Sequence, residues 1–136
     1  MELAFEQKQR SCLHRMAHLS LAQEQTQELI IPDSMPDASR TLICYAEPEV
    51  QSKTNREGSL LVTGTLRASC LYADEAGSLQ LLTSELPFTV KLESAELREE
   101  TQTLVRCCVR SADSRLINSR KVLLRVTVLV QANNYK

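Results

Sequence analysis

Three residues near the start of the chain, Cys12, His14 and His18, have side chains and a spacing that could bind a metal ion. Thiolate and imidazole groups are common zinc ligands, and two histidines four residues apart share one face of a helix. On a strand the same two histidines stand about 13 Å apart, too far to bind one ion. The alternation described below favours a strand here, so we expect no metal and no other cofactor.

The adjacent residues Cys107 and Cys108 are the second candidate for chemistry. On a strand they point to opposite faces, and Cys107 belongs to the apolar set as a small core residue. Cys108 shares the outer face with Arg106 and Arg110, and cations favour a reactive thiol. No histidine lies nearby in the sequence and the chain has no CxxC motif. A thiol enzyme built on Cys108 is therefore the weakest of the functional hypotheses.

Carboxylates and glycine-rich motifs give no catalytic site. The acidic residues fall mainly in predicted turns and connections, where solvation and turn hydrogen bonds explain them. With three glycines, the chain contains no GxGxxG, GxxxxGK[ST] or GxSxG motif. The sequence therefore predicts a protein that is not an enzyme and has no catalytic residues.

The elements that position these residues are predicted from alternating apolar residues. Val122–Gln131 has valine or leucine at every second position, and Leu60–Tyr72 repeats the pattern. Alternation with a period of two is typical of a strand with one face buried and one in water.

Further strands are predicted over Leu13–Ile31, Thr41–Gln51, Leu79–Glu93 and from Thr103 to Val109, with an interruption at Ser84–Glu85. Connections are predicted between them, at Lys53–Gly58, Ala73–Gly77, Ser94–Thr101 and Ser111–Arg115. Thr41–Gln51 should place Leu42, Cys44, Ala46, Pro48 and Val50 on one face. Pro48 places that strand at a sheet edge or a bulge. These elements predict an all-β fold, an antiparallel β-sandwich or barrel-like domain of six to seven strands.

The segment Leu19–Glu28 has an extended pattern but is polar on both faces in its middle. Such a strand gains little from burial and gains stability by pairing with another strand. We expect it to pair with a sheet edge, either in its own domain or in a neighbouring copy.

Composition narrows the class of protein. A chain of 136 residues with 43% apolar residues suits one folded domain, which we place at residues 13–136 after an extension at 1–12. A net charge of −1 and no basic stripe disfavour nucleic-acid binding. No apolar run suits a signal peptide or membrane insertion. Five cysteines, an odd number, predict reduced thiols in a cytoplasmic protein.

Several short motifs follow one another in a characteristic order. Two Pro-Asp steps precede a strand, a Gly-centred strand runs into a tyrosine, a Leu-Pro-Phe step follows, and an Asn-Ser-Arg-Lys step leads into the last strand. From Ile31 to Lys136 the chain resembles the SPOCS domain of SipL-like spore coat assembly proteins. The residues that carry the resemblance are Pro32, Asp33, Pro36, Asp37, Gly64, Tyr72, Pro87, Phe88, Asn118, Arg120 and Lys121.

The chain departs from that family in two respects. Family members carry more than one copy of the domain and end in a LysM domain, and neither is present in these residues. Ala38 also stands where a larger aliphatic residue is expected after the second Pro-Asp step. The family's contact with the spore coat ATPase runs through the LysM part, so that contact is not expected here.

The resemblance implies a non-enzymatic structural or interaction module for spore envelope assembly, on the mother-cell side of the developing spore. Its partners would be other proteins, either spore coat proteins or copies of itself in a homo-oligomer. The alternative is a small-ligand or carbohydrate-binding β-sandwich. That alternative needs exposed aromatic residues on a concave face, and the aromatic residues available are Phe5, Tyr45, Tyr72, Phe88 and Tyr135.

Overall fold

The computed structural model describes residues 15–135, which form strands joined by turns and contain no helix. Within this range there is accordingly no helix long and apolar enough to cross a membrane. The described part has six strands: β1 (Arg15–Ile30), β2 (Ala38–Arg56), β3 (Ser59–Asp74), β4 (Leu79–Glu93), β5 (Gln102–Asn118) and β6 (Lys121–Tyr135). The prediction of an all-β fold is confirmed.

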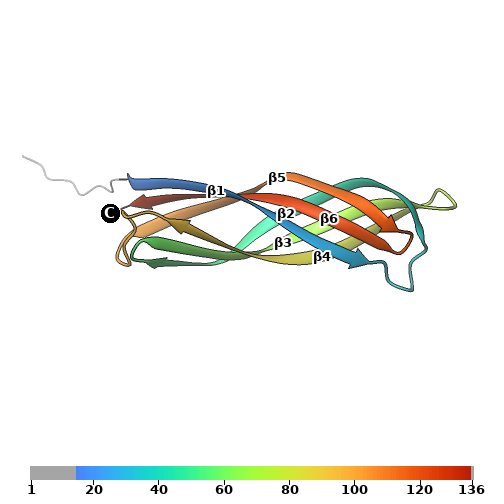
Figure 1. Cartoon of the computed structure of the whole chain (residues 1–136), viewed down its shortest axis with the longest axis horizontal. Coiled ribbons are helices and arrows are strands. Elements are labelled where there is room, and N and C mark those ends of the chain that lie inside the picture. Colours follow the sequence, from blue (N-terminus) through green and yellow to red (C-terminus); the bar gives the residue numbers. More distant parts are fainter. Residues whose placement is uncertain (1–14, 136) are drawn as a thin grey trace, which may run out of the picture.

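The strands form two antiparallel three-stranded sheets, with the orders β1-β6-β5 and β2-β3-β4. The sheets pack face to face as a sandwich (Figure 1). The strands are 15 to 19 residues long, about 50 Å at the usual rise per residue. The molecule is therefore elongated, and each sheet presents one long outer face.

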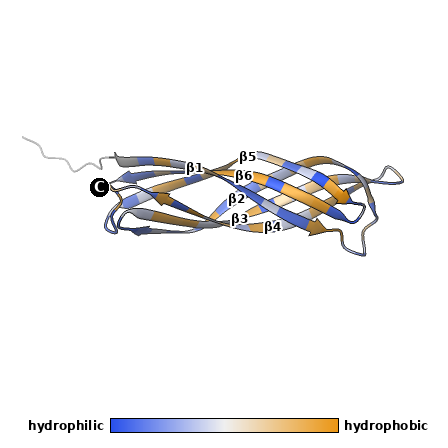
Figure 2. Ribbon diagram, viewed as in Figure 1, coloured by the Kyte–Doolittle hydropathy of each residue, from blue (hydrophilic) through white to orange (hydrophobic). Residues whose placement is uncertain are grey.

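The two central strands, β3 and β6, have the most regular alternation and supply much of the core. Figure 2 shows apolar and polar residues alternating along the ribbons. In β6 every second residue from Val122 to Val130 is fully buried. In β3 the buried positions begin at Leu60 and end at Asp74. The strongest patterns in the sequence therefore mark the strands with a neighbour on both sides.

The edge strand β1 resolves the two alternatives for Leu19–Glu28. The segment pairs with β6 of its own chain, from Leu19 opposite Ala132 to Glu28 opposite Leu123. Its glutamines Gln23, Gln25 and Gln27 lie half-buried on the inner side, while the residues between them are exposed. Backbone pairing with β6 compensates for the weak apolar burial of this strand.

The edges of the two sheets are joined by side chains. Thr41 Oγ1 on β2 donates to Ser114 O on β5 at 3.3 Å. On the opposite side of the sandwich, Gln23 Nε2 on β1 donates to Thr89 O on β4 at 3.1 Å. On the β2/β5 side, Lys53 Nζ and Asn55 Nδ2 add donors to Thr103 O and Thr101 O, so several side chains of β2 bond to the backbone beside them.

The prediction for β2 is correct at its centre and wrong toward its ends. Ala46 is buried and Cys44 half-buried, but Leu42 and Val50 are exposed. Register shifts lie between Thr41 and Ile43 and between Val50 and Ser52. A bulge adds a residue to one strand, so the alternation of faces changes phase at Leu42. Val50 still pairs with the buried Gly64, but it is 37% exposed on this edge strand.

Two predicted connections are wrong, because polar residues on the outer face of a strand resemble the polar residues of a turn. Ser111–Arg115 lies within β5, and the chain turns later, at Ser119–Arg120. Most of Lys53–Gly58 belongs to β2, which ends in a tight turn at Glu57–Gly58, where Gly58 has a φ of 80°. The left-handed conformation at this turn favours glycine.

The predicted interruption at Ser84–Glu85 is absent, because β4 runs unbroken from Leu79 to Glu93. Its register with β3 continues through both residues. The connection predicted at Ser94–Thr101 is confirmed as a turn region. Its Leu97 is fully buried, and Leu97 O accepts a hydrogen bond from Gly58 N at 3.0 Å. A single leucine of this polar connection thus joins the core.

A carboxylate introduced into β6 should destabilise the domain far more on the buried face than on the outer face. We expect Val126→Asp to destabilise the domain by about 3–5 kcal/mol, because Val126 is fully buried among aliphatic side chains. Thr127→Asp adds the same group one residue later, on the outer face opposite Glu24, and should cost less than about 1 kcal/mol. Urea denaturation of both variants measures the difference. Equal losses would contradict this assignment of faces.

Candidate functional site

The loop between β1 and β2, residues 31–37, carries the chain from one sheet to the other (Figure 1). Its two prolines, Pro32 and Pro36, have no backbone N–H and cannot continue a sheet ladder. One local hydrogen bond, from Met35 N to Pro32 O at 2.9 Å, forms a turn. Other carbonyl groups of the loop need donors from elsewhere in the chain.

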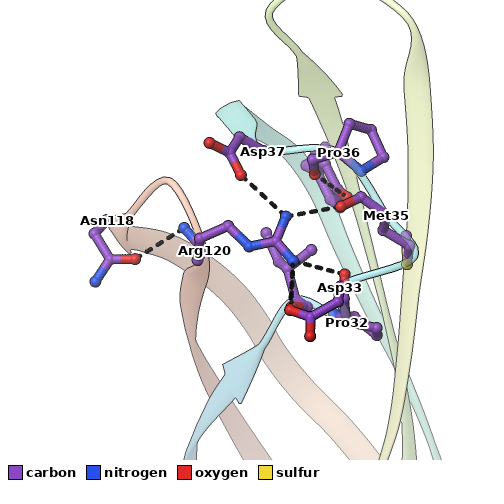
Figure 3. Close-up of polar contacts among 9 residues, drawn as sticks. Pro32, Asp33, Met35, Pro36, Asp37, Asn118 and Arg120 are labelled. Carbon is purple, nitrogen blue, oxygen red and sulfur yellow. Dashed lines mark hydrogen bonds and ion pairs between the residues drawn. The ribbon is translucent and has the colours of Figure 1, made fainter.

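Arg120 supplies those donors, as Figure 3 shows. Its Nη2 donates to Ile31 O at 2.8 Å and to Pro32 O at 2.7 Å. Its Nη1 donates to Met35 O at 2.7 Å and to the Asp37 carboxylate at 3.0 Å. We call Arg120, its loop acceptors and the residues that orient it the Arg120 cluster. A planar guanidinium with fixed donors suits this arrangement, which a single ammonium group cannot reproduce.

The turn between β5 and β6 orients the arginine. Arg120 N donates to Asn118 Oδ1 at 2.8 Å, and Arg120 O accepts from Ile31 N at 2.8 Å. Ser119 O accepts from Ala38 N, also at 2.8 Å. The turn and the loop are therefore joined by backbone as well as side-chain hydrogen bonds.

Tyr72 of β3 completes the cluster from the second sheet. Its side chain is fully buried, and its hydroxyl donates to Pro36 O at 2.9 Å. Burial raises the pKa of Tyr72, while the positive charge of Arg120 opposes that rise. The structure thus brings together, at one end of the sandwich, seven of the residues that carry the family resemblance: Pro32, Asp33, Pro36, Asp37, Tyr72, Asn118 and Arg120.

The remaining motif residues lie elsewhere and have structural contacts. Gly64 and Phe88 are opposite each other on β3 and β4. A Cβ at Gly64 would lie 2.3 Å from Glu49 O and 2.6 Å from Phe88 Cζ, so only glycine fits. Pro87 is exposed on the edge strand β4, and Lys121 forms an ion pair with Glu28 at 3.5 Å.

The Arg120 cluster is suited to holding the loop rather than to catalysis. Each terminal nitrogen of its guanidinium already makes two hydrogen bonds within the protein. The nearby Asp33 and Asp37 both face that cation, at 3.8 and 3.0 Å. The Tyr72 hydroxyl of the cluster belongs to a buried side chain and donates to Pro36 O.

The candidate metal ligands lie partly outside the described residues, since Cys12 and His14 precede residue 15. His18 is exposed, and its Nδ1 lies 2.7 Å from Asn133 Oδ1. Among residues 15–135 no group of three or more histidine, cysteine or acidic side chains could hold a metal ion. The absence of a metal from the whole chain stays a prediction.

The described thiols, Cys44, Cys70, Cys107 and Cys108, are all free. Cys108 is exposed on β5, as predicted, and Cys107 lies half-buried against the core. Burial, helped by the neighbouring Cys70 and Asp113, raises the pKa of Cys44 to about 11. Burial also raises the pKa of Cys107. A raised pKa reduces the thiolate fraction, so these two thiols are poor nucleophiles at neutral pH.

An apolar row on the outer face of β2-β3-β4 was missed from the sequence. Ile43, Leu71 and Leu81 lie directly opposite one another across the three strands, and we call them the apolar row. Ile43 is 62% exposed and Leu81 56% exposed, and the exposed Leu79 is two residues along β4. For Leu71, Leu79 and Leu81, the available sequence signal was their position on the outward side of the alternation in LYADEAGSLQLL.

A shallow hollow of about 470 Å³ adjoins the apolar row. Its lining includes the exposed Tyr45, the small side chains of Ser69 and Thr83, and the charged residues Glu47, Arg67 and Glu85. The Tyr45 hydroxyl donates to the Glu47 carboxylate, and this hydrogen bond raises the pKa of Tyr45.

Few aromatic residues are placed to support the carbohydrate-binding alternative. Tyr72 and Phe88 are buried, Tyr135 is half-buried, and Phe5 lies outside the described residues. In the described part, Tyr45 is the one aromatic side chain exposed beside a hollow.

Fold and site together define an antiparallel β-sandwich domain in which the Arg120 cluster joins the loop between β1 and β2 to the turn between β5 and β6. The family model of the SipL SPOCS domain matches residues 37–117, more than half of the chain. The chain belongs to this SPOCS-domain family. The match covers β2, β3 and β4 and β5 to its penultimate residue. No curated protein and no solved structure matches the chain.

The match leaves part of the Arg120 cluster outside it. Pro32, Asp33 and Pro36 precede the matched segment, and Asn118 and Arg120 follow it, as does Lys121. Asp37 and Tyr72 of the cluster lie within it. The cluster therefore connects the matched segment to β1 and β6.

The Arg120 cluster should be sensitive even to a change that keeps the charge. We expect Arg120→Lys to destabilise the domain by about 2–3 kcal/mol, because loop carbonyls lose charged donors in fixed positions. Arg125→Lys is the matched control, since Arg125 forms an exposed ion pair with Glu24 at 3.4 Å and should cost less than about 0.5 kcal/mol. Urea midpoints measure both. Similar losses would contradict the role given to Arg120.

Thiol labelling should separate the cysteines by exposure and pKa. In a Cys12→Ser background at pH 8, we expect iodoacetamide to label Cys108 first. Moving the pKa of Cys44 from 9.0 to about 11 lowers its thiolate fraction by about a hundredfold. Its labelling rate should therefore keep rising beyond about pH 10, where a thiol of pKa 9.0 is already about nine-tenths ionised. Peptide mass spectrometry follows each site, and unfolding in urea should equalise the rates.

Proposed function

We propose that this domain is a non-enzymatic interaction module that binds a protein partner during spore envelope assembly. The observation that carries the proposal is the apolar row on the outer face of β2-β3-β4, with Ile43 62% and Leu81 56% exposed. The outer face of an antiparallel sheet is normally polar when it faces only water. An exposed apolar group rimmed by polar residues is typical of a surface that binds another protein.

The state of the reactive groups supports a non-enzymatic role. Arg120 is engaged by the loop that it holds, and burial raises the pKa of both Cys44 and Cys107. The exposed Cys108 has no histidine beside it in the sequence. Since catalysis by a thiol or an acid-base pair needs positioned partners, these groups favour binding over chemistry.

The rigidity of the sandwich supports the same proposal. The apolar row draws one residue from each strand of its sheet, so its geometry is fixed by backbone pairing. A preorganised surface loses little conformational freedom when it binds. Membership of the SPOCS-domain family supports a spore-related setting. We place the partner among the proteins of the spore envelope, on the mother-cell side.

A localisation experiment with paired variants tests this proposal. A fluorescent fusion of the full chain is expressed in a sporulating endospore-forming bacterium. We expect the wild type to surround the developing spore and Leu81→Glu to become diffuse, because a charge in the apolar row opposes its burial. Thr89→Glu is the matched control, since Thr89 is exposed on the same strand outside the row and should leave the location unchanged.

A capture experiment with the same variants gives the second measurement. Immobilised wild type and Thr89→Glu should enrich the same spore envelope protein from a sporulating extract, and Leu81→Glu should lose it. Diffuse fluorescence of the wild type, or identical captured proteins on all three supports, would contradict the proposal.

A further inference from the structure

Along β5, the outer face of the other sheet, β1-β6-β5, carries three exposed arginines and one exposed acidic residue, Asp113, so positive charge is in excess there. Arg106, Arg110 and Arg115 are all exposed on this strand, and we call them the arginine strip. None of the three forms an ion pair with another residue of the described range. The other cations of this face are compensated, because Lys121 pairs with Glu28 at 3.5 Å and Arg125 with Glu24 at 3.4 Å.

The outer face of β2-β3-β4 carries the opposite charge beside the apolar row. Glu47, Arg67 and Glu85 lie opposite one another across the three strands, with Glu49 two residues along β2. We call Glu47, Glu49 and Glu85 the acidic band. Arg67 pairs with Glu49 at 2.8 Å, which leaves Glu47 and Glu85 without an ion pair in the described part.

We propose that the acidic band and apolar row of one molecule bind the arginine strip of a second copy of this chain. The contact joins two different faces, so each molecule has one face of each kind to offer. The inference rests on the proposed function, since it names the partner of the same apolar row. Complementary potentials favour this pairing and fix its orientation.

A contact between two identical faces is disfavoured by the same charges. Two acidic bands would bring Glu47 and Glu85 of both copies together, and two arginine strips would bring six guanidinium groups together. Like charges placed opposite one another are repulsive at a protein interface. The acidic band therefore needs a cationic surface, and the arginine strip is such a surface on the same chain.

The hollow beside the apolar row fits an arginine side chain. It has a volume of about 470 Å³, and its lining includes Tyr45, Glu47 and Glu85 beside the small Ser69 and Thr83. Arg67 also lines it, but its charge is compensated by the ion pair with Glu49 at 2.8 Å. A guanidinium placed there can bond to a carboxylate with two N–H groups and stack on the tyrosine ring. On the partner face, Cys108, Leu129 and Ala22 lie opposite one another across β5, β6 and β1. This less polar row can contact Ile43, Leu71 and Leu81.

The size of the faces is compatible with a specific but moderate interface. Three strands at about 4.8 Å spacing and about 50 Å length cover roughly 700 Å². A standard interface buries about 800 Å² on each partner. A contact between different faces leaves one free face at each end, so association continues into chains of molecules unless the rotation closes a ring.

Two charge-reversal variants test the inference on the purified full chain. The first, Glu47→Arg/Glu85→Arg, makes the acidic face basic, and the second, Arg106→Glu/Arg110→Glu, makes the basic face acidic. We expect the wild type to exceed dimer mass in sedimentation velocity as its concentration rises, and less so in 0.5 M salt. Each variant alone should stay monomeric at concentrations where the wild type associates. This requires a dissociation constant for self-association at least tenfold above that of the wild type.

Mixing the two variants gives the decisive measurement. Each then meets a partner of opposite charge on both faces, so association should return in an equimolar mixture. Glu96→Arg/Glu99→Arg is the control, because it makes the same charge change in the connection between β4 and β5 and should associate like the wild type. Circular dichroism and melting curves confirm that every variant is folded.

Every other outcome overturns the inference. A wild type that stays monomeric at all concentrations excludes self-association. Association that survives either charge reversal, or that does not return on mixing, assigns it to another surface. If the chain is monomeric but Leu81→Glu still loses its envelope protein in the capture experiment, the proposed function holds and the partner is a different protein.

Discussion

Burial of aliphatic side chains between the two central strands, β3 and β6, is the interaction on which the rest of the structure depends. The chain has no tryptophan and two phenylalanines, so valine and leucine on the inner faces must exclude water. Leu60, Val62, Val126 and Val128 are fully buried in one core cluster. Each of these central strands also pairs with an edge strand on either side. The weakly apolar β1 is therefore held in the sandwich by its backbone hydrogen bonds to β6.

The same alternation that buries one face of each sheet exposes the other, and this constraint links fold to function. Every outward position faces water or a partner, and most carry polar residues, as water requires. Ile43, Leu71 and Leu81 depart from that pattern on adjacent strands of one sheet. A single outward leucine is ordinary on a protein surface. Three apolar side chains in register across a sheet form a continuous apolar surface. This continuity supports a binding role more than the exposed fraction of any single side chain does.

The elements with strict alternation were predictable from the sequence, while those defined by distant contacts were not. Val122–Gln131 and Leu60–Tyr72 are strands because their own residues specify one buried face. Ser111–Arg115 resembled a turn, yet β5 continues through it because Ala112 and Ser114 face inward and Asp113 lies opposite Arg125. Arg120 was identified by resemblance, but its acceptors at Ile31 and Met35 are 89 and 85 residues away in sequence. No local pattern encodes such a contact.

The Arg120 cluster and the apolar row lie at the same end of the sandwich, and this proximity gives the motif residues a consequence beyond stability. The loop that Arg120 holds leads directly into β2 at Ala38, five residues before Ile43. Tyr72 bonds to Pro36 and is adjacent in sequence to Leu71 of the row. A displaced loop would move the start of β2 relative to β3, and with it the alignment of Ile43 with Leu71. The motif residues of this cluster therefore lie beside the strand ends that carry the apolar row, although they do not belong to it.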